Sequence, residues 1–98
     1  MMLQFLIRPT EVQWFSIPAY MLPVVCTPQC VPVEPRDDEW GDYSFAIGAV
    51  EVGCSYEDPG LHITFEGDIE EALAQQIVEE ILANLTRITG QAGRIVSL

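Results

Sequence analysis

Lysine is absent from the 98 residues, and histidine occurs once, at His62. Without lysine the chain can form no Schiff base with a carbonyl substrate, and no lysine can clamp a phosphate. With one histidine it can build neither an HExxH motif nor a facial triad that takes two imidazoles from one chain. The scattered glycines form neither GxGxxG nor a Walker A loop. These absences exclude several large classes of enzyme.

Long apolar runs and positive charge are also scarce. Runs free of proline and charge are far shorter than the roughly 20 residues of a transmembrane helix. Residues 1–7 lack the basic start and the small-residue cleavage site of a signal peptide, so we expect a cytoplasmic protein. The basic residues are four arginines against fifteen acids, a net charge of 4 − 15 = −11. Because this field repels nucleic-acid phosphate and anionic lipid, we expect neither nucleic acid nor membrane as a partner.

Apolar residues make up 49% of the chain, which predicts a folded protein despite the charge. A length of 98 residues suits a single domain. Residues 1–35 hold six of the seven prolines, so strands there are short or lie at a sheet edge. Between these prolines, β-branched and aromatic residues predict strands over residues 3–7, 12–17 and 20–25.

A β-hairpin is predicted over residues 43–66. Its strands, residues 43–56 and 61–66, are joined through a type II turn in which Pro59 supplies the fixed φ and Gly60 the positive φ. Alternation along the strands separates a core face from an outer face. The core face holds Val50, Val52, Cys54, Tyr56, Leu61, Ile63 and Phe65. The outer face holds Glu51, Gly53, Ser55, His62, Thr64 and Glu66, and continues into Phe45, Ile47 and Ala49.

A long helix is predicted over residues 69–89. Asp68 with Glu71 three positions later matches a capping box, and Gly90 matches the left-handed residue that ends a helix. Its apolar residues form a stripe about 180° wide, too broad for one sheet contact. They are Leu73, Ala74, Ile77, Val78, Ile81, Leu82, Leu85 and Ile88. Either the proline-rich segment or a second subunit must cover the remainder.

These elements, with a short strand over residues 94–98, predict an α+β fold. We expect one small domain over residues 1–98, with a mainly antiparallel sheet and the long helix packed on one face. Residues 36–42 form a loop between its halves. The broad helical stripe and the apolar residues Phe45 and Ile47 on the outer strand face also predict a homodimer.

The three cysteines leave alternatives open. Cys26 and Cys30 have CxxxC spacing, and with Cys54 and His62 they would supply three thiolates and one imidazole for zinc. Because Cys54 and His62 are predicted on opposite hairpin faces, we expect no metal site. A disulfide between Cys26 and Cys30 needs an oxidising compartment, and the odd number of cysteines favours reduced, buried thiols. No cofactor is expected.

The loop over residues 36–42, RDDEWGD, is the first candidate partner-binding site. Its candidate residues are Asp37, Asp38, Glu39, Trp40 and Asp42. An aromatic residue ringed by carboxylates is typical of protein interfaces with a buried anchor and a charged rim. A solvated acidic loop, with Trp40 folded back on the sheet, is the structural alternative. The loop lacks the ligand spacing of a calcium-binding EF-hand.

The outer hairpin face is the alternative site. Glu51, His62 and Glu66 place two carboxylates beside the one imidazole, which could bind a cation or a small ligand or perform acid–base chemistry. We favour the simpler interpretation, in which these residues form the solvated face of an antiparallel sheet.

The sequence favours a non-enzymatic, acidic protein-interaction module. Its charge and its candidate aromatic anchor suit an inhibitor or immunity-type partner of a basic protein. A small-ligand or cation-binding module on the outer hairpin face is the alternative. A hydrolase or isomerase with His62 as general base is a third hypothesis, and no motif assigns a catalytic residue.

Overall fold

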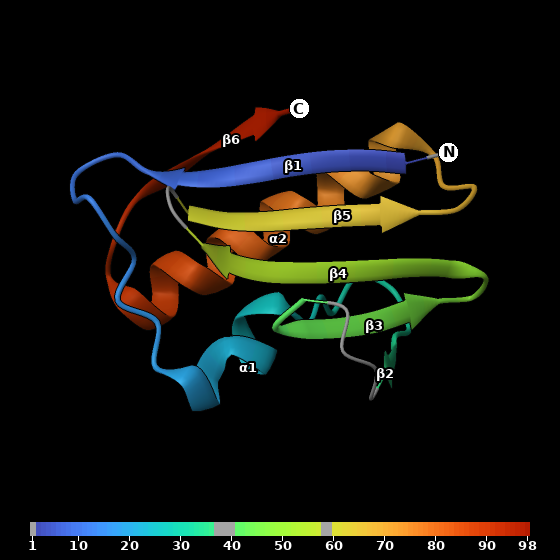
Figure 1. The fold of residues 1–98 in the computed structure, drawn as a ribbon, viewed down its shortest axis with the longest axis horizontal. Coiled ribbons are helices and arrows are strands. Elements are labelled where there is room, and N and C mark those ends of the chain that lie inside the picture. The colour runs from blue at the N-terminus through green and yellow to red at the C-terminus, as the bar shows by residue number, and fades with distance from the viewer. Residues whose placement is uncertain (1, 37–40, 58–59) are drawn as a thin grey trace.

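The computed structural model describes residues 2–36, 41–57 and 60–98. One antiparallel sheet has the strand order β2-β3-β4-β5-β1-β6 (Figure 1). Its strands are β1 (Met2–Pro9), β2 (Glu34–Arg36), β3 (Tyr43–Ile47), β4 (Val50–Glu57), β5 (Gly60–Glu66) and β6 (Gly93–Ser97). The helical elements are a 3-10 turn, η1 (Ala19–Met21), a short helix, α1 (Leu22–Cys26), and a long helix, α2 (Glu71–Thr89). The predicted α+β fold is confirmed.

The sheet and α2 form two layers. In Figure 1, α2 crosses behind β1, β5 and β4, and the strands face the viewer. α2 contacts β1 and β6, and α1 packs against α2. Among the described elements, no helix covers the opposite face of the sheet. Over the same residues, no helix combines the length and the hydropathy that crossing a membrane requires.

The β4–β5 hairpin has the predicted faces. Val52 lies opposite Phe65, Cys54 opposite Ile63, and Tyr56 opposite Leu61. All of these are fully buried except Tyr56, which is half-buried at the end of β4. Alternation therefore identified the core side of this hairpin correctly.

The prediction of one strand over residues 43–56 is wrong, because the chain turns back at Gly48 and Ala49. Gly48 has φ +59°, and Ile47 pairs with Val50 across this two-residue turn. A two-residue turn reverses the parity of the alternation. Phe45 therefore lies opposite Val52 on the core face and is fully buried, and Ile47 packs against the same core.

The proline-rich segment differs most from the predictions. The strand over residues 3–7 is confirmed within β1, but residues 12–17 form bends and irregular chain. Residues 20–25 are helical, because Pro23 lies in the first turn of α1, where a missing N–H costs nothing. The short strand β2 ends at Arg36, which was predicted as loop.

The long helix and its C-terminus are confirmed, and the predicted capping box is wrong. α2 begins at Glu71 and follows an N-cap residue, Glu70, whose side chain makes no capping bond. Ile69 is instead buried in the core, so its packing holds the chain outside the helix up to Glu70. Gly90 has φ +72° and donates its N–H to the carbonyl of Thr86, as a left-handed terminator does.

The core lies between the sheet and α2. Phe5 and Phe65 pack edge to face, with ring centroids 5.8 Å apart. On α2 the fully buried residues are Ala74, Ile77, Val78, Ile81 and Leu85. The remaining stripe residues, Leu73, Leu82 and Ile88, are only half-buried.

The segment after η1 covers the flank of α2. The side chain of Glu80 accepts hydrogen bonds from the backbone N–H groups of Gln29 and Cys30. We expected either the proline-rich segment or a second subunit to cover the rest of the apolar stripe of α2. In the structure the proline-rich segment does so. Phe45 and Ile47 do not lie on the outer face of the sheet. Neither this face nor the helical stripe therefore still supports the predicted homodimer. The oligomeric state stays a prediction that light scattering tests.

Gly60 is needed for close packing, and the positive φ predicted for it is wrong. It belongs to β5 and is absent from the glycines with positive φ. A Cβ at this position would lie 2.0 Å from the carbonyl oxygen of Ile7, so only glycine permits this approach of β1. The predicted turn residues Asp58 and Pro59 lie outside the described residues.

Candidate functional site

Asp42 is the one predicted partner-binding residue that the structure describes. Its side chain is exposed, just before β3 begins. The other four candidates, Asp37, Asp38, Glu39 and Trp40, lie outside the described residues.

Two hydrogen bonds fix Asp42 against β4. Its backbone N–H donates to the carbonyl of Cys54, at 2.9 Å, and its Oδ2 accepts the backbone N–H of Tyr56, at 2.7 Å. The carboxylate thus satisfies an amide of β4 at the point where β3 stops pairing. Gly41 makes this approach possible, since its φ is +78° and a Cβ there would lie 2.8 Å from the Cys54 carbonyl oxygen.

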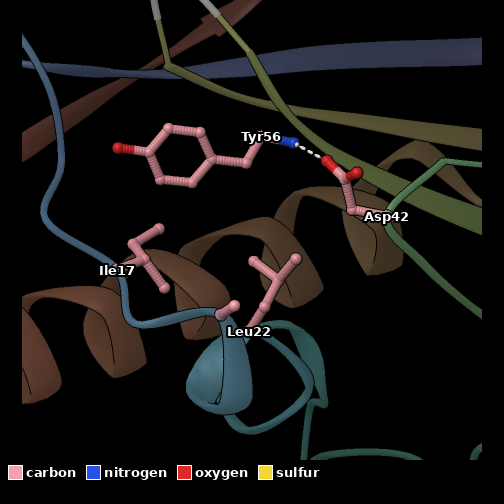
Figure 2. Close-up of a pocket in the computed structure, with 5 residues that line it drawn as sticks. Ile17, Leu22, Asp42 and Tyr56 are labelled. Carbon is pink, nitrogen blue, oxygen red and sulfur yellow. Dashed lines mark hydrogen bonds between the residues drawn. The ribbon is translucent and has the colours of Figure 1, made fainter.

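Asp42 borders a cavity of about 440 Å³. The other lining residues are Ile17, Ala19, Leu22 and Tyr56. Figure 2 shows the Tyr56 ring across the hollow from Ile17 and Leu22, with Asp42 on the side of the Tyr56 backbone. The volume lies within the roughly 300–1,000 Å³ of small-molecule sites.

The cavity walls are extensions of the core. Leu22 belongs to the buried cluster, and Ile17 and Tyr56 are partly buried against it. Burial raises the pKa of the Tyr56 phenol, so the hydroxyl is neutral at physiological pH. The described lining residues therefore offer a fixed carboxylate, a phenol and aliphatic walls, and none of them is a nucleophile activated by a neighbouring base.

The sequence predictions missed this cavity. Residues 12–17 and 20–25 were predicted as strands, whereas Ile17 lies in irregular chain and Leu22 opens α1. The available signal was Pro23 in the first helical turn.

Large apolar side chains are exposed on the segment that forms one wall of the cavity. Among the described residues, the large hydrophobic side chains with most exposure are Met2, Val12, Trp14, Tyr20, Val24 and Leu98. Four of these six belong to residues 12–24. Tyr20, which follows the lining residue Ala19, is 80% exposed.

The alternative site residues share the outer hairpin face, but His62 lies opposite Ser55, four residues along each strand from Glu51 and Glu66. Glu51 lies opposite Glu66, and both ring nitrogens of His62 have partners: Nδ1 lies 3.3 Å from Glu57 Oε1 and Nε2 lies 3.1 Å from Gln4 Oε1. Glu51 Oε1 lies 3.6 Å from Arg36 Nε, whereas its Oε2 is buried without a hydrogen-bond partner.

The cysteines do not gather around one point. Cys26 and Cys54 are fully buried, and Cys30 is exposed. A hydrogen bond with Cys26, together with burial, raises the pKa of the Cys54 thiol well above its ordinary value. Over the described parts of the chain, no group of three His, Cys, Asp or Glu side chains is arranged to hold a metal ion.

The fold defines the chain as a small α+β protein with one antiparallel sheet and one long helix on it. Comparisons with protein-family models, with curated proteins and with solved structures give no match. The function is therefore inferred from the site itself.

Proposed function

We propose that this protein is a non-enzymatic interaction module that binds a partner with a basic surface, of the inhibitor or immunity type. The observation that carries the proposal is Asp42, which one backbone and one carboxylate hydrogen bond hold at a cavity with apolar walls. Beside it runs the segment with the exposed side chains of Trp14 and Tyr20.

Charge supports this choice of partner. A net charge of −11 on 98 residues attracts a basic surface over about one Debye length, roughly 8 Å at physiological salt. One of the four arginines, Arg36, is already paired with Glu34, at 3.1 Å, and with Glu51. Steering of this kind raises the association rate more than it raises affinity.

Affinity requires buried anchors, and the segment over residues 12–24 supplies candidates. Tryptophan and tyrosine are enriched among the residues that dominate binding energy in protein interfaces. Trp14 is 49% exposed and Tyr20 is 80% exposed, so both retain apolar area that a partner can bury.

A photocrosslinking amino acid at Tyr20, used in the native host, tests the proposal. The captured protein is then purified and its binding kinetics are measured against salt for Trp14→Ala and Tyr20→Ala. Met2→Ala is the matched control, because Met2 is also half-exposed but lies on β1. We expect a basic partner, an association rate that falls with salt, and faster dissociation in the two aromatic variants only. A purified partner that binds independently of salt and of both aromatic residues would contradict the proposal.

The outer hairpin face supports a second candidate, a cation-binding or small-ligand module. The observation in its favour is Glu51 Oε2, which is buried without a hydrogen-bond partner opposite Glu66. Calorimetric titration with Ca²⁺ tests it: saturable binding that Glu51→Gln abolishes would support this candidate, and no heat at millimolar Ca²⁺ would reject a calcium site.

A further inference from the structure

The cavity beside Asp42 has one polar side and several apolar walls. The aliphatic side chains of Ile17 and Leu22 lie across from the Tyr56 ring, and the Asp42 carboxylate closes one side (Figure 2). A ligand that fills this space needs an apolar stem and a group that complements a carboxylate.

The Asp42 carboxylate retains unused acceptor capacity. Its Oδ2 binds the Tyr56 amide, and Oδ1 accepts no hydrogen bond from the part of the chain that the structure describes. Each carboxylate oxygen has two lone pairs, so Asp42 can bind a donor without releasing Tyr56. Because its two bonds to β4 already hold it, little side-chain entropy is lost when a ligand binds.

The aromatic wall favours a guanidinium group. A guanidinium stacks on an aromatic face and donates several hydrogen bonds to a carboxylate, and it is more weakly hydrated than an ammonium. Asp42 and Tyr56 both line the cavity, with the carboxylate at the backbone end of Tyr56 and the ring extending away from it (Figure 2), so a planar cation bound to the carboxylate can reach the near edge of the ring. An anionic ligand is opposed by Asp42 and by the net charge of −11.

We propose that this cavity receives an arginine side chain of the protein partner. The aliphatic stem lies against Ile17 and Leu22, and the guanidinium lies between Asp42 and the ring of Tyr56. This inference rests on the proposed function, since the basic surface of that partner supplies the arginine. Charge complementarity and the exposed Trp14 and Tyr20, which belong to the segment that contributes Ile17, Ala19 and Leu22 to the cavity, favour a protein side chain over a free cation.

Titration of the ¹⁵N-labelled full chain, followed by NMR, tests the proposal with defined probes. The probe is acetyl-Gly-Arg-Gly-amide, and the control peptide carries citrulline, the neutral isostere of arginine. We expect saturable shifts of the amides of Ile17, Leu22, Asp42 and Tyr56 with the arginine peptide, with a Kd on the order of 1 mM. The citrulline peptide should bind at least about tenfold more weakly, since charge-assisted hydrogen bonds are lost.

Two variants separate the site from general charge. Asp42→Asn keeps an acceptor for the Tyr56 amide but loses the charge, and should weaken the arginine peptide about tenfold. Ala19→Phe leaves Asp42 intact and fills the cavity, so it should abolish binding. Asp68→Asn is the matched control, because this exposed acid follows β5 at the opposite end of the hairpin from Tyr56.

Other outcomes overturn the proposal. These are equal binding of the two peptides, equal weakening by Asp42→Asn and Asp68→Asn, or binding that survives Ala19→Phe. Binding of n-butylguanidinium without binding of the arginine peptide would assign the cavity to a free small cation. If the partner's binding depends on Trp14 and Tyr20 but not on Asp42 or Ala19, the inference fails while the proposed function stands. If the arginine peptide binds as expected and the captured partner binds without dependence on salt, Trp14 or Tyr20, the proposed function fails.

Discussion

The side-chain amide of Asn84, on α2, donates a hydrogen bond to the backbone carbonyl of Val25, on α1, over 3.2 Å. The same Nδ2 lies 3.5 Å from the carbonyl oxygen of Thr27. Carbonyls at the end of a helix lack partners within that helix, so Asn84 satisfies groups that would otherwise remain unpaired. This contact docks α1 on α2, and α1 carries Leu22, one wall of the cavity.

Removing this contact should destabilise the protein. We expect Asn84→Ala to lower the free energy of unfolding by about 1–2 kcal/mol, because partly buried carbonyls lose their donor. Urea denaturation measures the effect, with Gln76→Ala, at an exposed position of α2, as the control. Equal stability of the two variants would mean that water replaces Asn84 without cost.

The Glu80 carboxylate makes part of the stability depend on pH. Its burial raises its pKa, but hydrogen bonds from the backbone of Gln29 and from the thiol and backbone of Cys30 together outweigh burial and lower the pKa. A carboxylate with a lowered folded-state pKa stabilises the fold above its unfolded-state pKa, about 4.3, and this stabilisation is lost as pH falls through the folded-state value.

Glu80→Gln should therefore be less stable than the wild type at pH 7, by about 1 kcal/mol for a carboxylate still partly open to water. The difference should shrink progressively below about pH 4. Glu79→Gln is the matched control, because it removes the same charge from an exposed neighbouring position. Denaturation curves at pH 7 and pH 3 measure the difference in unfolding free energy between Glu80→Gln and the wild type. A difference that does not change with pH would contradict the role given to Glu80.

Ile81 lies at the centre of the buried face of α2 and is fully buried. Ile81→Ala should lower the free energy of unfolding by about 2–5 kcal/mol, because it removes apolar contacts and leaves a cavity. Leu73 is half-buried, so Leu73→Ala should lower the free energy of unfolding by less than Ile81→Ala does. A loss below about 1 kcal/mol at Ile81, measured by chemical denaturation, would not fit this layer order.

The three cysteines should react at two distinct rates. Cys30 is exposed, but slight burial and a hydrogen bond to Glu80 raise its thiol pKa, so its reaction with Ellman's reagent should accelerate with pH. Cys26 and Cys54 are fully buried and should react only after unfolding. Glu80→Gln should speed the reaction of Cys30 at a fixed pH. Reaction of all three thiols with Ellman's reagent at one rate in the native protein would contradict the burial of Cys54.

The sequence predicted the elements whose signals are local. The alternation of β5 and the period of α2 needed no knowledge of their neighbours, and Gly90 marked the helix end. The sequence did not predict the turn at Gly48, because residues 47–50 contain no proline and no polar turn residue. The two-residue turn there places Phe45 on the opposite face from the predicted one. Val24 and Val25 favour strand by propensity, but Pro23 and packing on α2 make them helical.

The cavity could not be predicted because it depends on contacts between distant segments. The face of Tyr56 follows from alternation, yet nothing in residues 12–25 indicates that Ile17 and Leu22 come to lie beside it. Asp42 was selected for its charge in an acidic loop. Its specific position results from Gly41 and from hydrogen bonds to Cys54 and Tyr56.

The acidic segment before Asp42 should steer a basic partner, and an aromatic side chain should anchor it. Neutralising Asp37, Asp38 and Glu39 together should slow association and flatten its salt dependence, because salt screens such charges over about 8–10 Å. Trp40→Ala should mainly speed dissociation, since it removes apolar area that the partner buries. Stopped-flow association and surface plasmon resonance with the purified partner separate the two effects. If binding is indifferent to salt and to all four substitutions, this segment only solubilises the protein, and the outer hairpin face of Glu51, His62 and Glu66 becomes the candidate to test.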